Sequence, residues 1–189
     1  LVAMNILSGC GVSMSLPDSN ECIPHFGGNQ GPGYPLFIAI ISVLSEKSDL
    51  IVRIVQAALC SLSISYLTFA IFKYNLNKRT AIIVGLVIAI SPLGVAWPRY
   101  ILTEGLALAA TCWVFAELLR SLKSKELKVM PLAVGLIVAT FVRLDAVLLF
   151  VPLIVAAFLA HNPLKAMKKV IQVGLILTVP WSAWIYRNH

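Results

Sequence analysis

Long apolar stretches alternate with short basic segments along this chain. A membrane-spanning helix needs about 20 mostly apolar residues. Stretches of that kind occupy residues 50–72, 80–97, 101–119, 129–160 and 170–186. The pattern predicts an all-α protein, a polytopic transmembrane helical bundle.

The stretch 129–160 is too long for a single crossing. A straight helix of this length would measure about 48 Å at about 1.5 Å per residue, whereas a hydrocarbon core is about 30 Å thick. Its charged residues, Arg143 and Asp145, lie in the middle. We therefore predict two helices, 129–142 and 146–160, that turn at these residues in a recessed pocket surrounded by protein or water.

The basic residues support this turn. The loops 73–79, 120–128 and 161–169 contain ten of the fifteen Lys and Arg residues. If 129–160 crosses twice, all three loops lie on one side of the membrane, which the positive-inside rule makes the cytoplasmic side. The prediction is then about six crossings, at residues 50–72, 80–97, 101–119, 129–142, 146–160 and 170–186.

This topology divides the chain into two regions. Residues 1–49 form an extracytoplasmic loop, in which the apolar segment 34–44 is too short to span and is predicted to lie at the interface. Residues 50–189 form the transmembrane domain. The chain begins with Leu1 and ends shortly after an apolar stretch, so we interpret it as a fragment of a longer protein. The predicted location is the plasma membrane of a prokaryote or the endoplasmic reticulum of a eukaryote.

Composition narrows the class of protein. Hydrophobic residues make up 59% of the chain and charged residues 12%, with a mean hydropathy of +0.90. Soluble domains have about 45–50% hydrophobic residues and about 25% charged residues. A soluble enzyme, a disordered chain and a coiled coil therefore all fit this composition poorly. The net charge of +7 arises from the basic loops, which we interpret as topology signals and not as a nucleic-acid interface.

Polar residues gather at the predicted outer ends of the crossings, where they form the candidate site. They are Arg99, Tyr100, Glu104, Arg143, Asp145 and Arg187. Ionisable groups inside a membrane indicate functional sites. Three arginines at one membrane face suit a phosphate group, because the planar guanidinium matches phosphate oxygens in pairs. An acidic residue beside them suits a divalent cation or a hydroxyl nucleophile that needs a base.

Each of these charged residues also has a purely structural interpretation. Glu104 is favourable near a helix N-terminus because of the helix dipole. Arg143 can pair with Asp145 or extend towards the interface, and Asp145 can cap the next helix. Arg99 and Arg187 can be interfacial anchors.

Two further polar pairs occur within the crossings. Glu117 is three residues before Arg120, a spacing that predicts an ion pair at the inner end of its helix. Arg53 and Gln56 share one face of the first crossing, which suggests a buried polar contact.

Several segments, in order, resemble motifs of the polytopic C-type glycosyltransferases, the group that includes dolichyl-phosphate-mannose–protein mannosyltransferases and lipid A aminoarabinose transferases. The segment GPGYPLF at 31–37 is similar to their PPGYPLF segment in the first outer loop. The other segments that resemble family motifs are residues 3–11, 52–56, 100–104, 135–145 and 180–188. In the segment 135–145, Leu144 stands where proline is usual. The resemblance covers nearly the whole chain.

The resemblance implies transfer of a sugar from a polyprenyl-phosphate carrier to a protein, lipid or glycan acceptor on the non-cytoplasmic face. The family's catalytic aspartate is expected shortly before Leu1, so the fragment alone is expected to be inactive. The residues expected to bind substrate are Arg99, Tyr100, Arg143, Asp145, Arg187 and Tyr34, which lines the loop that covers the pocket; Glu104 would support catalysis by orienting the acceptor or holding a divalent cation.

Two other functions remain open at this stage. A transporter or flippase for an anionic lipid or solute would share an arginine-lined cavity and a broken helix pair. Apart from Glu117, however, no ionisable residue lies deep in the predicted inner halves of the crossings, which favours a pocket open to one side. The third interpretation is a structural subunit of a membrane complex.

Overall fold

A computed structural model of the 189-residue chain describes residues 2–7, 31–44, 48–74, 77–91, 100–124 and 126–188. Its helices are α1 (Val2–Leu7), α2 (Gly33–Leu44), α3 (Ser48–Lys73), α4 (Lys78–Ile90), α6 (Thr103–Ser124), α7 (Val129–Val142), the 3-10 helix η2 (Leu144–Leu149), α8 (Phe150–Phe158) and α9 (Pro163–Asn188). No strand occurs in these described ranges, so the predicted all-α class is confirmed.

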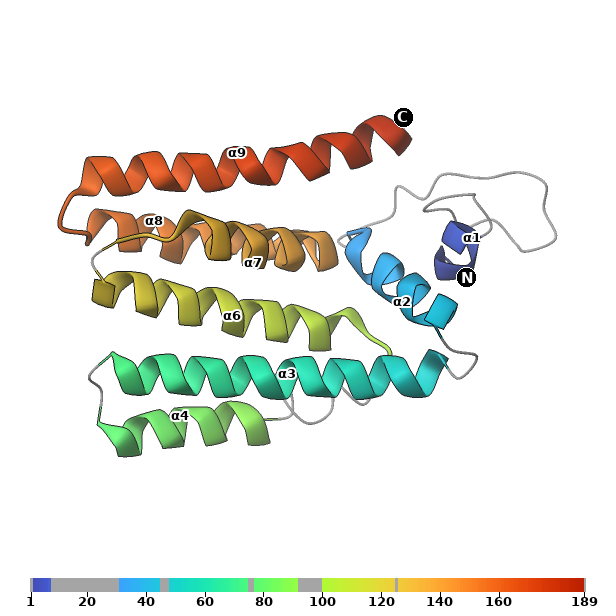
Figure 1. Ribbon diagram of the computed structural model, residues 1–189, viewed down its shortest axis with the longest axis horizontal. Helices are drawn as coiled ribbons and strands as arrows, with labels where there is room; N and C mark the ends of the chain where they lie inside the picture. Colours follow the sequence, from blue (N-terminus) through green and yellow to red (C-terminus); the bar gives the residue numbers. More distant parts are fainter. Residues whose placement is uncertain are drawn as a thin grey trace.

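The long helices lie side by side with their axes nearly parallel (Figure 1). α3 packs against both α4 and α6, α6 packs against α7, and α7 and α8 both pack against α9. The helices α3, α4, α6 and α7 alternate in direction along the chain, and α9 runs opposite to α8. The short helices α1 and α2 lie at one end of this bundle, and α2 is inclined to the long helices.

Two helices are long and apolar enough to cross a membrane on length and composition alone, namely α3 from Asp49 to Lys73 and α6. Helices α2 and α7 and the segment Leu144–Phe158 are apolar but shorter. The predicted number of about six crossings is therefore not confirmed within the described residues.

The last long helix begins earlier than predicted. Residues 163–169 were expected to belong to a basic loop, but α9 already begins at Pro163. The side chain of Asn162 accepts a hydrogen bond from the backbone N–H of Lys165 at 3.1 Å and caps the helix. Proline is favoured at the first position of a helix because its missing N–H would have no partner there. Local capping thus outweighs the polar composition of this segment.

The helix that starts at Val129 is interrupted at Arg143. This residue has extended backbone angles, φ −146° and ψ 126°, while its N–H still donates to Ala139 O at 2.9 Å. After the break, the chain runs back as η2 and α8 (Figure 1); η2 packs against α7, and α8 packs against α9. The interruption occurs at the charged pair, within the stretch that is too long for a single crossing.

Small and aliphatic side chains fill the space between the helices. The largest buried cluster joins α6, α7, α8 and α9 and includes Val114, Leu132, Leu136 and Leu153, all at most 1% exposed. Gly135 brings α7 against α6, since a Cβ there would lie 2.8 Å from both Trp113 and Val114. Close approach through small residues is typical of helix packing in membranes.

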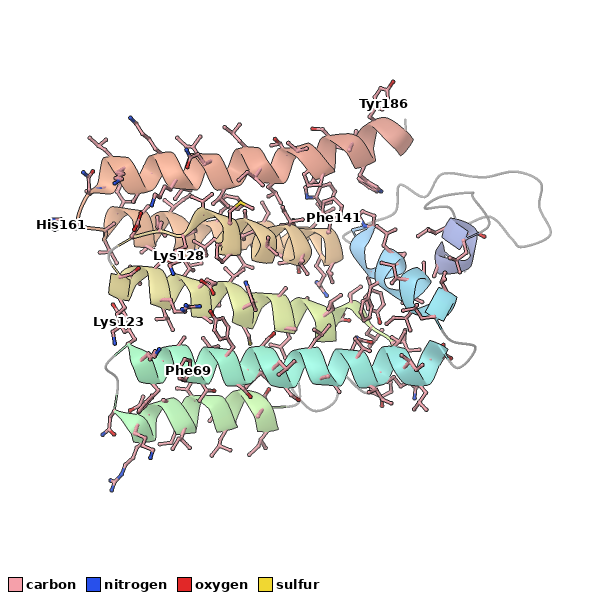
Figure 2. The ribbon with its side chains drawn as sticks, viewed as in Figure 1. Phe69, Lys123, Lys128, Phe141, His161 and Tyr186 are labelled. Atoms are coloured by element: carbon pink, nitrogen blue, oxygen red, sulfur yellow. The ribbon has the colours of Figure 1, made fainter. Side chains whose placement is uncertain are left out.

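Basic side chains collect at one end of the bundle, which we call the basic end. Lys73 ends α3, Lys78 begins α4, Lys123 lies in the last turn of α6, Lys128 precedes α7 and Lys165 lies in the first turn of α9. Figure 2 shows Lys123 and Lys128 at this end, together with His161. The three basic loops of the sequence therefore meet at one end of the bundle.

Helix α2 is joined to the other end of the bundle by buried polar contacts. The hydroxyl of Tyr34 donates to Gln56 Oε1 at 3.3 Å, and Gln56 Nε2 donates to the carbonyl oxygen of Leu102 at 3.0 Å. Gln56 is 0% exposed, whereas Arg53, predicted to share a buried polar contact with it, is exposed. Just before α2, a Cβ on Gly31 would overlap the carbonyl group of Phe141, so only glycine allows this approach to α7.

Replacing Gln56 with leucine tests this link. The substitution leaves the Tyr34 hydroxyl and the Leu102 carbonyl without their partner, which costs about 1–3 kcal/mol for a buried group. We expect the unfolding temperature of the detergent-solubilised protein to fall clearly for Gln56→Leu. The matched control is Gln172→Leu on the exposed face of α9, for which we expect little change. Equal unfolding temperatures for the two variants would mean that the buried contacts of Gln56 do not stabilise the bundle.

Candidate functional site

One arginine and two carboxylates from different elements meet at the end of the bundle opposite the basic end. Nη1 of Arg143 lies 3.0 Å from Glu104 Oε1. On its other side, Nη2 lies 2.8 Å from Asp145 Oδ2, and Nε lies 3.0 and 3.2 Å from the two oxygens of the same carboxylate. A single guanidinium thus connects α6 to the turn between α7 and η2.

Local structure presents each of these side chains. Glu104 stands in the first turn of α6, where its second oxygen accepts a hydrogen bond from the Thr103 hydroxyl at 3.2 Å. Arg143 occupies the extended residue between α7 and η2, and Asp145 lies in the first turn of η2. Because the helix is interrupted there, the arginine side chain can reach across to α6.

The three residues line a pocket of about 380 Å³ between α6 and η2. Their charged groups form one part of its wall. The rest of the wall is largely apolar and comes from both elements: Ala107, Leu108, Thr111, Ala146, Leu148 and Leu149. The pocket therefore offers charges beside an apolar surface, as an amphiphilic ligand requires.

The charges within this cluster are only partly balanced. Glu104 and Arg143 are 27% and 29% exposed and Asp145 is 49% exposed, so all three remain accessible to solvent. The hydrogen bond from Arg143 holds the pKa of Asp145 below its usual value. Two carboxylates then face one guanidinium. Three of the five N–H groups of Arg143 have acceptors among the described residues, which leaves two for a ligand.

Tyr34 lies near this site but does not line the pocket. It is 6% exposed, packs with Leu106 and Val142, and directs its hydroxyl to Gln56. Burial raises the pKa of Tyr34 to about 12. The residue therefore fastens α2 to the bundle. Its expected role in the loop that covers the pocket stays a prediction.

The remaining predicted site residues are not brought into the cluster by the described part of the chain. Tyr100 is 58% exposed and is absent from the pocket wall. Arg99 lies outside the described residues, as does the side chain of Arg187, although the backbone of Arg187 belongs to the last turn of α9. Both arginines stay predictions.

The apolar wall of the pocket was not predicted from the sequence. Ala107, Leu108 and Thr111 follow Glu104 by three, four and seven residues, which is the spacing of one helix face. Helical periodicity could therefore have identified them once Glu104 was chosen. Leu148 and Leu149 carry no such signal, because their place depends on the backbone path after Arg143.

At the basic end, the structure confirms the predicted pair of Glu117 and Arg120, whose charged atoms lie 3.1 Å apart. The Tyr66 hydroxyl donates to the Glu117 carboxylate and accepts from Arg120. Glu117 is only 2% exposed, so these contacts lower the cost of burying its charge. This acidic residue connects α3 to α6 and does not belong to the pocket.

Residues 29–184 match the family model of the dolichyl-phosphate-mannose-protein mannosyltransferases. The chain belongs to this family. No curated protein and no solved structure matches it. The matched range contains all three members of the charged cluster, whereas Arg187 lies beyond it.

Membership of the mannosyltransferase family identifies the general activity. The protein is a membrane glycosyltransferase of the mannosyltransferase type, and it belongs to a family of integral membrane proteins. The two long apolar helices are consistent with that location. A divalent cation stays a prediction. Within the described ranges, no three His, Cys, Asp or Glu side chains gather as metal ligands.

Labelling of introduced cysteines tests whether the pocket and the basic end lie on opposite membrane faces. Each cysteine is introduced into a variant in which serine replaces Cys10 and Cys22. Cys60 and Cys112 are kept, because they are buried. We expect a membrane-impermeant maleimide added outside intact cells or vesicles in the native orientation to label Asp145→Cys. Lys168→Cys should react only after permeabilisation, because basic loops stay cytoplasmic. Labelling of both variants from the same face would contradict the predicted topology.

Proposed function

We propose that the protein transfers a sugar from a polyprenyl-phosphate carrier to an acceptor on the non-cytoplasmic face of the membrane. The supporting observation is the position of Arg143, held between two carboxylates beside an apolar pocket wall, at the end of the bundle away from the basic loops. This proposal includes a multi-pass arrangement in which the bundle axis lies along the membrane normal. In a prokaryote the membrane would be the plasma membrane, and in a eukaryote the endoplasmic reticulum.

The two halves of a lipid-linked donor match the two parts of the pocket. Its phosphate would accept hydrogen bonds from the two remaining N–H groups of Arg143, since guanidinium groups bind phosphate oxygens in pairs. The first part of its polyprenyl chain would lie against the apolar side chains of α6 and η2, among them Leu108 and Leu149. The sugar would then lie near Glu104.

Transfer follows an inverting displacement in this proposal. The acceptor hydroxyl or amine loses its proton to the aspartate expected upstream of Leu1 and attacks the anomeric carbon. The bond between that carbon and the phosphate oxygen breaks, and polyprenyl phosphate leaves with the bonding electrons. Arg143 stabilises the negative charge that develops on this leaving group.

The described cluster needs further positive charge for this step. Two carboxylates and one guanidinium sum to a negative charge, which repels an incoming phosphate. Arg99 and Arg187 are the proposed additional cations, as the family resemblance implies. Asp145 then serves to position Arg143, because its carboxylate binds Nε and Nη2 together in the planar fork geometry.

Glu104 is proposed to orient the acceptor. Its carboxylate is already held by Arg143 and by the Thr103 hydroxyl, so its direction is determined before a substrate binds. Lone pairs that these contacts leave free can accept a hydrogen bond from the acceptor hydroxyl or amine. A divalent cation is the other proposed partner of Glu104, with further ligands from outside the described ranges.

Arg143→Ala tests the leaving-group role. We expect turnover of radiolabelled lipid-linked sugar by the full-length protein to fall about 10²–10³-fold, the usual cost of removing one charge-stabilising donor. Arg143→Lys should recover only part of the activity, because an ammonium cannot form the paired contact. The matched control is Arg53→Ala, an exposed arginine of α3 outside the pocket. Wild-type turnover in Arg143→Ala would remove this residue from the site.

Glu104→Gln and Asp145→Asn should affect different kinetic constants. If Glu104 orients the acceptor, Glu104→Gln lowers kcat/KM for the acceptor about 10²-fold and leaves KM for the lipid donor nearly unchanged. Asp145→Asn loosens Arg143, so it should change KM for the donor instead. Steady-state kinetics with each substrate varied in turn measures the difference. A change confined to donor KM in both variants would assign Glu104 to positioning Arg143.

A further inference from the structure

A second pocket lies between α3 and α4, on the side of α3 away from the charged cluster. Its volume is about 510 Å³. The walls are formed mainly by aromatic side chains of α3, Phe69 and Phe72, and by small residues of α4, Ala81, Gly85 and Ala89. The activity proposed above makes no use of this groove.

Positive charge lies at one end of the groove, where it meets the basic end of the bundle. Lys78, the first residue of α4, lines the groove itself. The ammonium of Lys73 lies 4.8 Å from the ring centroid of Phe69, a groove residue. Lys123 donates a hydrogen bond to the carbonyl oxygen of Lys73 and so adds a third cation. Figure 2 labels Phe69 on α3 and Lys123 at the basic end.

These lysines are not neutralised by the acidic residues described at the same end. Glu117 is paired with Arg120, and Glu126 is paired with Lys169 at 2.8 Å. The contact with Lys169 also holds the pKa of Glu126 below its usual value, so this carboxylate is ionised and faces Lys169. The positive charge at the mouth of the groove is thus available to a negative ligand.

The groove lies along a close contact of the two helices and opens outward. A Cβ on Gly85 would overlap the side chain of Thr68, and both residues line the groove. Ser65 of α3 and Ala89 of α4 are exposed along the groove, which therefore opens to the surroundings of the bundle. An apolar groove that opens to the lipid and ends at lysines matches a lipid with an anionic headgroup.

We propose that this groove binds an anionic phospholipid from the leaflet at the basic end. One acyl chain lies between α3 and α4, and the phosphate contacts Lys73 and Lys78. The acyl chain would fill the open groove between these two helices. Charge complementarity selects this occupant over a zwitterionic lipid, whose headgroup carries its own cation, and over an apolar helix, which would leave the lysines unused.

Native mass spectrometry of the purified full-length protein tests the proposal. The protein is mixed with equal concentrations of palmitoyl-oleoyl-phosphatidylglycerol and palmitoyl-oleoyl-phosphatidylcholine. We expect preferential retention of phosphatidylglycerol, and about a tenfold fall in that retention in the double variant Lys73→Gln/Lys78→Gln. The matched control Lys165→Gln/Lys168→Gln removes the same charge from exposed positions of α9, and we expect it to behave like the wild type.

A second variant separates the groove from its charge. Ala89→Phe adds a bulky side chain at an exposed groove position without changing charge, and we expect it to lower phosphatidylglycerol retention; Ser65→Phe provides the same test from α3. Unfolding temperatures without added lipid confirm that each variant is folded. Three results would overturn the proposal: equal losses in the two double lysine variants, unchanged retention in both phenylalanine variants, or equal retention of the two lipids by the wild type. Loss of a dimer instead of lipid in Ala89→Phe would assign the groove to a second copy of the chain.

Discussion

The contact of one guanidinium with two carboxylates organises the end of this bundle opposite the basic end. Arg143 interrupts an apolar stretch that is too long for a single membrane-spanning helix. The interruption exposes the arginine to α6, where Glu104 completes the contact. These ion pairs hold the turn at Arg143 against the start of α6 and so shape the pocket between α6 and η2, while apolar packing joins α6 to α7.

Polar contacts occur at both ends of the bundle, but they have different roles. At the end opposite the basic end, the side chains of Glu104, Arg143 and Asp145 are between about a quarter and a half exposed and line a pocket. At the basic end, Glu117 is nearly inaccessible, and Tyr66 and Arg120 both contact one oxygen of its carboxylate. Exposure separates a group that can bind a substrate from one that joins two helices. Glu104 and Glu117 are both glutamates of α6. Their burial and their partners distinguish them, whereas their residue type does not.

Family membership and geometry contribute different parts of the functional conclusion. The family model identifies a membrane glycosyltransferase of the mannosyltransferase type. The geometry shows which charged residues of this chain lie beside an apolar pocket wall, and it places Tyr34 at the interface between α2 and the bundle. The contact chain from Tyr34 through Gln56 to Leu102 also explains why α2, a helix too short to span, packs firmly beside the site.

Hydropathy and charge along the chain were sufficient to predict an all-α protein, the interruption near Arg143 and the gathering of the basic loops at one end, because these features follow from local composition. The contacts of Arg143 with Asp145 and of Glu117 with Arg120 could also be predicted, since two or three residues separate the partners. Tertiary structure alone decided that Glu104, 39 residues before Arg143, shares its guanidinium. A helix apolar on every side has no amphipathic face to indicate its rotation, and one residue of rotation turns a side chain by about 100°. Packing between helices therefore determines which polar groups meet.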